Sequence, residues 1–301
     1  MCEPVILQIK NANQRLGLLP ELGGSAAFWE VRRGEAWHDI WRPYEPAEDG
    51  KRVVANFPLV PFSNRITGGG ITVDGEFYAM TPNRAGAFPI HGTGWMDEWS
   101  VRQHDAQTIE LVTESHHKHG YPWDYFAIQR YSVTEDSMTM RLEVEHRGDK
   151  PMPYGLGWHP YTLRGSDANG PRLKVRADGY WKNDDNGIPV QHSHELPDGW
   201  DFNMLRILGH GKIDNNFSGW DGRVLMERDD IDLRIESITT EPAGLRTSII
   251  FRPENQPFFC VEPITHITDA FNKLGMPGLR MLAKGERMAL ELVHQLSHIN
   301  G

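Results

Sequence analysis

The chain has 301 residues, of which 39% are hydrophobic and 24% charged, and its formal net charge is −10. This composition is typical of a soluble globular protein, and the length is enough for one large domain or two ordinary ones. The chain has no run of clustered lysine and arginine, which disfavours a nucleic acid partner.

Two features of the chain bear on its compartment. Its first 17 residues lack the basic flank and long apolar centre of a signal peptide, and no 18-residue apolar run occurs anywhere. We therefore expect a cytoplasmic protein with no membrane partner. The only cysteines are Cys2 and Cys260, which is too few for a disulfide framework and fits a reducing compartment.

Alternation of apolar and polar residues is the main structural signal and predicts half-buried strands. In the segment 136–146, for example, Met138, Met140, Leu142 and Val144 share one face. A tight Asp74-Gly75 turn between alternating residues predicts a β-hairpin over 72–78. In chain order, the predicted strands cover residues 107–115, 136–146, 172–177, 230–237, 247–254 and 287–296.

Helical periodicity is nearly absent, and 20 prolines and 30 glycines are spread along the chain. We find no low-complexity linker and no internal repeat of fixed period. The sequence thus predicts an all-β fold, a large antiparallel β-sandwich, formed by a single domain over residues 1–301.

Two motifs in the first third of the chain carry candidate binding residues. Arg65 in "PFSNRI" could bind a ligand hydroxyl, although by itself an ordinary surface ion pair is the simpler interpretation. His91 in "PIHGTGW" precedes two glycines that let the backbone approach a ligand closely. A histidine that merely occupies a glycine turn is an equally good interpretation of His91.

The middle of the chain offers two more candidates. His159 in "WHPY" precedes Pro160, which restricts it to an extended conformation suited to a positioned proton donor. The competing interpretation is a core histidine with satisfied hydrogen bonds. Asp214 in "KIDNNF" could accept hydrogen bonds from two adjacent sugar hydroxyls. Alone, that motif fits an Asx-turn better.

Glu262 is the strongest candidate, because the apolar run 258–261 delivers it to the end of a strand that is predicted to be fully buried. A buried carboxylate is costly unless it is used or paired, so we favour a functional role over a structural ion pair. Alternation places Cys260 on the same face, where we interpret it as a small core residue and not as a nucleophile.

Cofactor signals are weak. The "HHKH" segment at 116–119 lies in a predicted loop, and no second ligand cluster of recognisable spacing accompanies it. The glycines at 68–70 are not followed by the Lys-Ser or Lys-Thr of a phosphate-binding loop. We therefore predict no metal site and no cofactor.

Taken together, six motifs resemble the aldose 1-epimerase (galactose mutarotase) family. They span residues 61–272 and occur in the family's order: "PFSNRI", "IHGTGW", "GYPWDY", "WHPY", "DNNF" and "VEPITHITDAFN". The resemblance implies the galactose mutarotase-like supersandwich, an antiparallel fold that agrees with the strand pattern. It also implies an isomerase that acts on a small-molecule sugar, an aldose, and needs no cofactor.

The resemblance implies a role for each matching residue. Glu262 corresponds to the family's general base and His159 to its general acid, while Arg65, His91 and Asp214 correspond to residues that bind the sugar. Interconverting the anomers requires a proton to leave the anomeric hydroxyl while the ring oxygen gains one. A carboxylate and an imidazole suit this exchange because burial and neighbours can tune their pKa values.

Departures from the well-studied galactose-acting members indicate a divergent, bacterial-type member. They are the threonine two residues after His91, the threonine three residues after His159 and the proline after Glu262. Two alternatives stay open: a hexose 6-phosphate mutarotase, for which Arg84 offers one basic group, and a sugar-binding protein without catalysis. The sequence fixes neither the sugar nor the oligomeric state, nor whether Trp95 and Trp158 contact substrate.

Overall fold

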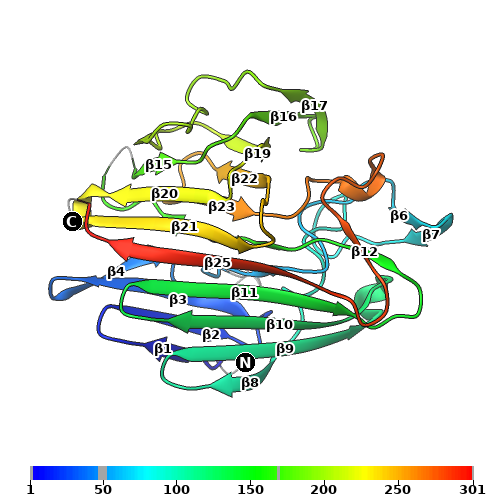
Figure 1. Ribbon diagram of the computed structural model, residues 1–301, viewed down its shortest axis with the longest axis horizontal. Helices are drawn as coiled ribbons and strands as arrows, with labels where there is room; N and C mark the ends of the chain where they lie inside the picture. The colour runs from blue at the N-terminus through cyan, green and yellow to red at the C-terminus, as the bar shows by residue number, and fades with distance from the viewer. Residues whose placement is uncertain (1–2, 47–52, 168–169, 300–301) are drawn as a thin grey trace.

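A computed structural model describes residues 3–46, 53–167 and 170–299; Cys2 therefore lies outside the described residues. Two large sheets dominate it and pack face to face (Figure 1). All pairings between their strands are antiparallel, as are those of three small two-stranded sheets. The predicted all-β sandwich is confirmed.

The first large sheet has ten strands. In spatial order these are β1 (Leu7–Lys10), β2 (Gln14–Leu19), β3 (Ser25–Arg33), β4 (Ala36–Trp41), β14 (Thr162–Leu163), β23 (Phe258–Pro263), β22 (Thr247–Arg252), β19 (Ile213–Ser218), β16 (Gly179–Asn183) and β17 (Pro189–Ser193).

The second large sheet has nine strands. Their spatial order is β18 (Arg206–Ile207), β15 (Arg172–Lys174), β20 (Arg223–Arg228), β21 (Leu233–Glu241), β25 (Arg287–Ser297), β11 (Ser137–His146), β10 (Asp124–Val133), β9 (Thr108–His116) and β8 (Ser100–His104).

Small elements complete the described residues. The two-stranded sheets are β5 (Pro58–Leu59) with β13 (Gly157–Trp158), β6 (Gly70–Val73) with β7 (Glu76–Ala79), and β12 (Met152–Tyr154) with β24 (Arg280–Leu282). Three short 3₁₀ helices are η1 (Lys118–Gly120), η2 (Asp229–Ile231) and η3 (Ala270–Asn272). In this part of the chain, no helix has the length and apolar character needed to cross a membrane.

The core lies between the two large sheets and follows from the alternation of the strands. In β11 the four predicted inward residues, Met138, Met140, Leu142 and Val144, are completely buried. Across the interface, the ring of Trp29 from β3 lies 5.2 Å from that of His294 in β25, measured between centroids. Burying one face of each sheet in this way supplies the main driving force for folding.

One predicted strand begins three residues later than expected and another ends three residues earlier. Ile231 lies in η2 and not in a strand, because Asp232 adopts a left-handed conformation (φ 45°) and pairing begins only at Leu233. In 172–177 ladder pairing ends at Lys174, since the N–H of Val175 donates to the carbonyl of Phe202 in a loop instead.

The remaining predicted strands are found close to their predicted bounds. β9, β11 and β25 match to within one residue, and β22 ends at Arg252, two residues before its predicted end. The hairpin β6–β7 turns at Asp74 and Gly75, both of which have positive φ (49° and 81°), as a type I′ turn requires.

Candidate active site

Glu262 lies near the end of β23, a strand in the interior of the ten-stranded sheet. Every residue of β23 after Phe258 is buried, so both faces of this strand are covered. β22 pairs with it on one side, with Ile249 opposite Glu262. The apolar run predicted from the sequence therefore does carry a carboxylate into the interior, where only 3% of its residue surface is exposed.

His159 follows directly after β13, whose pairing with β5 fixes the start of the segment. Its backbone N–H donates to the carbonyl of Phe57 at 3.2 Å. The imidazole is stacked between two aromatic rings: Phe57 lies 4.8 Å away at 22° and Tyr161 lies 4.5 Å away at 25°, between centroids. This sandwich leaves the ring little freedom to rotate.

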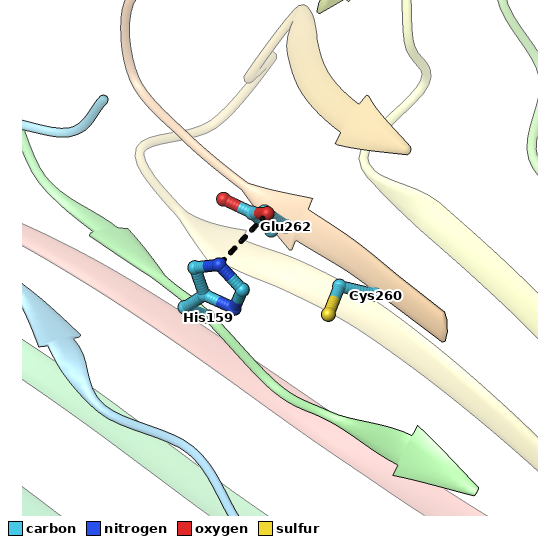
Figure 2. A group of neighbouring side chains, drawn as sticks. All are labelled: His159, Cys260 and Glu262. Carbon is cyan, nitrogen blue, oxygen red and sulfur yellow. Dashed lines mark ion pairs between the residues drawn. The ribbon is translucent and has the colours of Figure 1, made fainter. Parts of the chain in front are cut away.

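The two side chains meet (Figure 2). His159 Nε2 lies 3.3 Å from Glu262 Oε1, within reach of a shared proton. The second carboxyl oxygen, Oε2, is buried and has no hydrogen-bond partner among the described residues. A buried polar atom of this kind is available to a ligand hydroxyl.

Burial pushes both groups toward their neutral forms. It lowers the pKa of His159 to about 3, with smaller contributions from the charges of Arg42 and Arg84. It raises the pKa of Glu262 well above its usual value, helped by the nearby carboxylate of Asp214 and opposed by Arg65. Perturbed titratable groups in contact are typical of sites that transfer protons.

His91 stands edge-on to the reacting pair, with its ring centroid 5.5 Å from that of His159. Its Nδ1 accepts a hydrogen bond from the backbone N–H of Asn64 at 3.1 Å. Burial, with the neighbouring His159 and Arg65, lowers the pKa of His91 well below its usual value. In the resulting neutral ring the proton is on Nε2, which can donate to a ligand.

Left-handed residues shape the backbone around Arg65. Asn64 (φ 54°), His91 (φ 62°) and Asp269 (φ 60°) all have positive φ, which is uncommon outside glycine. Asp269 N–H donates to the carbonyl of Arg65 at 3.0 Å, and its carboxylate accepts from Thr67. Backbone conformations of this kind cluster at active sites and ligand-binding segments, where the surrounding contacts hold them in place.

Asp214 lies in β19, opposite Phe251 of β22, so the Asx-turn interpretation is wrong. Burial raises the pKa of its carboxyl group, against the opposing charges of Arg65 and Lys212. The register brings Asp214 toward Glu262, because Asp214 pairs with Phe251 of β22 and Phe251 pairs with Cys260, two residues before Glu262 in β23. Arg65 itself bonds to the side chain of Asn64, and it forms no ion pair with a carboxylate among the residues that the structure describes.

The structure thus brings all five candidate residues together from widely separated segments. Of the two tryptophans left open, Trp158 is fully buried in the core, whereas Trp95 is partly exposed and lies 6.0 Å from the ring of Phe57. The segment 116–119, predicted to be a loop, runs from the last residue of β9 into η1; there His116 contacts Asp124 and His119 contacts Asp97.

Three residues around His159 are not marked by the sequence. Tyr161 lies in the "WHPY" motif, but nothing in the chain identifies it or Phe57 as a stacking partner. The guanidinium of Arg42 lies 3.4 Å above the ring of Tyr161, which extends the stack by one more layer. No local pattern around Arg42 signals this contact, because Arg42 and Tyr161 come from distant parts of the chain.

Cys260 lies on the same side of β23 as Glu262 (Figure 2). Ligand atoms of His159, Cys260 and Glu262 lie within 4.8 Å of one another, which is a set that could hold a divalent metal. Metal binding needs a thiolate, and burial raises the pKa of the Cys260 thiol well above its usual value.

Comparisons with known proteins agree with this geometry. Residues 6–295 match the profile of a family described as aldose 1-epimerase. The chain is 32% identical over 242 residues to the uncharacterized protein YphB of Escherichia coli K12, covering 78% of this chain and 81% of that protein. It is 31% identical over 137 residues to the aldose 1-epimerase of the same organism, covering 42% and 38%.

Solved structures share the fold. A protein of Escherichia coli K12 provisionally named an aldose 1-epimerase superimposes with a TM-score of 0.88 at 27% identity, covering 99% of this chain and 100% of that one. A GalM/aldose epimerase homologue from C. elegans superimposes with a TM-score of 0.82 at 18% identity, covering 99% and 100%. The sandwich is therefore of the galactose mutarotase-like type.

Proposed function

Because the chain belongs to the aldose 1-epimerase family, we propose that it interconverts the α and β anomers of an aldose by general acid–base catalysis. One observation carries the proposal: Glu262 and His159, both buried, approach to 3.3 Å. The anomeric oxygen O1 and the ring oxygen O5 are bonded to the same carbon. An adjacent base and acid match two adjacent oxygens.

In the proposed reaction, the single proton that the pair shares is on His159 at the moment of exchange. The carboxylate of Glu262 then removes the proton from O1 while His159 delivers its proton to O5. The bond between C1 and O5 breaks as the carbonyl at C1 forms. Rotation about the C1–C2 bond turns the other face of the carbonyl toward O5. Ring closure then returns the proton on O5 to His159 and the proton on Glu262 to O1, so the protein ends in its starting state.

Arg65, His91 and Asp214 are proposed to hold the sugar. The Nε2–H of neutral His91 and the guanidinium of Arg65 are hydrogen-bond donors, and the carboxylate of Asp214 is an acceptor. A polyhydroxylated ring offers both kinds of partner. Holding C1 against the reacting pair lowers the entropic cost of the reaction.

Polarimetry tests the proposal directly. The decay of optical rotation of freshly dissolved α-D-galactose and α-D-glucose is followed with wild-type protein and with Glu262→Gln. We expect wild type to accelerate the decay and Glu262→Gln to lose roughly 10²–10⁴-fold of that acceleration. Glu254→Gln, at an exposed position in the loop between β22 and β23, is the matched control and should retain the rate.

Two outcomes would overturn parts of the proposal. A wild-type rate in Glu262→Gln removes the proposed base. Failure of wild type to accelerate any sugar in a panel of hexoses, pentoses and glucose 6-phosphate removes the activity, and leaves a sugar-binding protein as the interpretation. If only glucose 6-phosphate responds, Arg84→Ala should abolish that response, since its exposed side chain is the basic group that the phosphate would use.

A further inference from the structure

A second cleft, of about 280 Å³, lies beside the loop in which β22 turns into β23. Arg164 and Arg252 line it, together with residues 253–256 of that loop and with His210 and Gly211, which precede β19. The five candidate active-site residues, all of which are described, are absent from its wall. Its volume lies just below the range of sites for drug-sized ligands, which fits a smaller group.

This cleft and the candidate active site are on opposite faces of the ten-stranded sheet, in which β19, β22 and β23 are neighbours (Figure 1). Phe251 of β22 pairs with Cys260, and its ring lies 6.3 Å from that of His159, between centroids. Phe251 is therefore on the active-site face. Successive side chains of a strand point to opposite faces, so Arg252, the next residue, points away from the active site.

Arg252 carries a buried positive charge that is bonded to neutral groups. Its residue surface is only 3% exposed. Nε donates to the carbonyl of Gly211 at 2.7 Å, and Nη1 donates to that of Leu208. Within the part of the chain that the structure describes, Nη2 makes no hydrogen bond and Arg252 forms no ion pair. A buried charge without a counter-charge is costly, so an anion in the cleft would stabilise it.

Nη2 of Arg252 is placed to meet such an anion. It lies beside the wall residue Gly211, where a Cβ would come within 3.7 Å of it. Gly211 has φ +92°, a conformation that side chains other than glycine rarely adopt. The glycine therefore leaves the space next to this nitrogen free of a side chain, and the guanidinium can be approached from the cleft.

Arg164 adds a second positive charge to the same wall. Its residue surface is 8% exposed, and Nη2 donates to the carbonyl of Gly209 at 2.6 Å. The loop 208–211 thus accepts hydrogen bonds from both guanidinium groups. Burial, with the charges of Arg164 and Arg206, lowers the pKa of Arg252 to about 10. These cations repel one another, and a bound anion would offset that repulsion.

The other polar groups of the wall also fit an anion. Glu254 is the one carboxylate among the described residues that line the cleft, and it is exposed. The remaining polar side chains are the amides of Asn255 and Gln256, which can donate hydrogen bonds. Guanidinium groups recognise oxyanions through paired N–H donors. A phosphate group, with up to two negative charges, matches two arginines better than a carboxylate does.

We propose that this cleft binds the phosphate group of a small molecule, either inorganic phosphate or a phosphate monoester. The guanidinium groups of Arg164 and Arg252 hold the phosphate oxygens. The amides of Asn255 and Gln256 contact the rest of the ligand. Because the site shares no residue with the proposed sugar site and takes part in no chemical step, it does not depend on the proposed function.

Calorimetric titration with inorganic phosphate at neutral pH tests the proposal. Sodium chloride keeps the ionic strength constant, so that only specific binding is measured. We expect wild type to bind phosphate with a millimolar or lower dissociation constant. Arg164→Gln should weaken binding by about tenfold or more, since a charge-assisted hydrogen bond is lost. Glu254→Gln should tighten it, because the carboxylate of Glu254 opposes the anion.

Two features keep this test decisive. Glu254 is exposed, so Glu254→Gln probes the cleft even if Arg164→Gln folds poorly. Arg84→Ala is the control, because Arg84 is an exposed cation on the side of the candidate active site, and it should keep the wild-type affinity. The absence of binding at millimolar phosphate overturns the proposal. So does binding that is lost in Arg84→Ala, or binding that neither cleft variant changes.

A panel of ligands distinguishes the two sources of phosphate. Glycerol 3-phosphate and glucose 6-phosphate are titrated into wild type and Arg164→Gln beside inorganic phosphate. An ester that binds more tightly than inorganic phosphate, and depends on Arg164, identifies a phosphate monoester as the occupant. Equal affinities identify phosphate itself. Tighter binding of acetate or citrate than of every phosphate compound overturns the choice of a phosphate group. None of these measurements involves turnover, so failure of the proposed function leaves them unaffected.

Discussion

Glu262 and His159 together hold one proton over a wide pH range. Burial lowers the pKa of the imidazole to about 3 and raises that of the carboxyl group. A second proton joins the pair only in strong acid, and the single proton leaves only above the raised carboxyl pKa. The proposed exchange needs this state, in which one group gives a proton and the other takes one.

The proposed activity should therefore show a broad plateau against pH. We expect the rate constant to stay flat from neutral pH into mild acid, without a step at the ordinary imidazole pKa near 6.5. The loss of rate in alkali should follow the raised carboxyl pKa. Polarimetry between pH 4 and 9, limited to conditions in which circular dichroism shows folded protein, checks this. An acid limb centred near 6.5 would contradict it.

Glu262 also carries a cost in stability that depends on pH. A carboxyl pKa that is raised in the folded state favours the protonated form there, so stability is lost as pH rises from the unfolded value of 4.5. We expect Glu262→Gln to gain stability relative to wild type over this interval. Urea midpoints of both proteins at pH 4, 6 and 8 measure the difference. A difference that stays constant or shrinks as pH rises would refute the raised pKa.

At the residue level, the sequence predicts what depends on local context. Glu262 is marked by the apolar run that precedes it, and His159 by the proline that follows it. The stack of Phe57, His159, Tyr161 and Arg42 joins three distant segments. Nothing within a few residues of Arg42 or Phe57 encodes a contact with the imidazole, so this part of the site required the fold.

At the level of elements, the turn after His91 depends on one glycine. Gly92 has φ +68°, and a Cβ there would lie 2.2 Å from the carbonyl oxygen of Val60. Both the left-handed conformation and the close backbone therefore require glycine. This contact ties the loop that carries His91 to the segment that leads to Arg65.

Gly92→Ala should destabilise the protein far more than a left-handed conformation alone accounts for. Gly34 is the matched control, since its φ is +59° but a Cβ would meet nothing within 4 Å. We expect Gly34→Ala to cost about 1–2 kcal/mol and Gly92→Ala roughly 3 kcal/mol or more. Urea unfolding of both variants measures this. Equal losses would show that the contact with Val60 relaxes freely.

Element boundaries show where alternation stops being informative. The strand at 136–146 was predictable because its inward residues meet one apolar layer. Ile231 and Val175 continue the same alternation but lie outside the ladders. Ile231 precedes a turn at Asp232, and the backbone N–H of Val175 donates to the loop carbonyl of Phe202. The pattern records which side chains are buried and does not record whether a ladder or a loop buries them.

On the scale of the whole molecule, buried neutral histidines link stability to acid. Burial lowers the pKa of His159 to about 3, those of His266 and His294 to about 4, and that of His91 well below its usual value. The unfolded chain binds these protons below about pH 6.5, whereas the folded protein does not. Stability should therefore fall as pH drops from 6.5 toward these lower values.

We expect each such histidine to add a slope of about 1.4 kcal/mol per pH unit within its interval. His294→Gln should reduce the slope of the unfolding free energy against pH by the contribution of about one bound proton. This change in slope is expected whatever the effect of the substitution on absolute stability. Denaturant titrations at pH 5, 6 and 7 measure this slope. Replacement of the exposed His104 controls for the loss of a histidine as such, and an equal flattening there would contradict the assignment.

The fold class was accessible from the sequence, but the order of strands was not. Alternation identifies half-buried strands, and the absence of helical periodicity leaves a sandwich. No sequence pattern predicts that β14 lies between β4 and β23, or that β19, β22 and β23 are neighbours. These neighbours assemble the site, because they bring Asp214 close to Glu262.

The place of β25 in the nine-stranded sheet has a consequence for biosynthesis. β25 lies between β21 and β11, and it is translated after every other described strand. Until β25 leaves the ribosome, this sheet exists as two separate groups of strands. One group is β8, β9, β10 and β11, and the other is β15, β18, β20 and β21. In a nascent chain both edges stay unpaired until then, and unpaired strand edges are prone to pair with other chains.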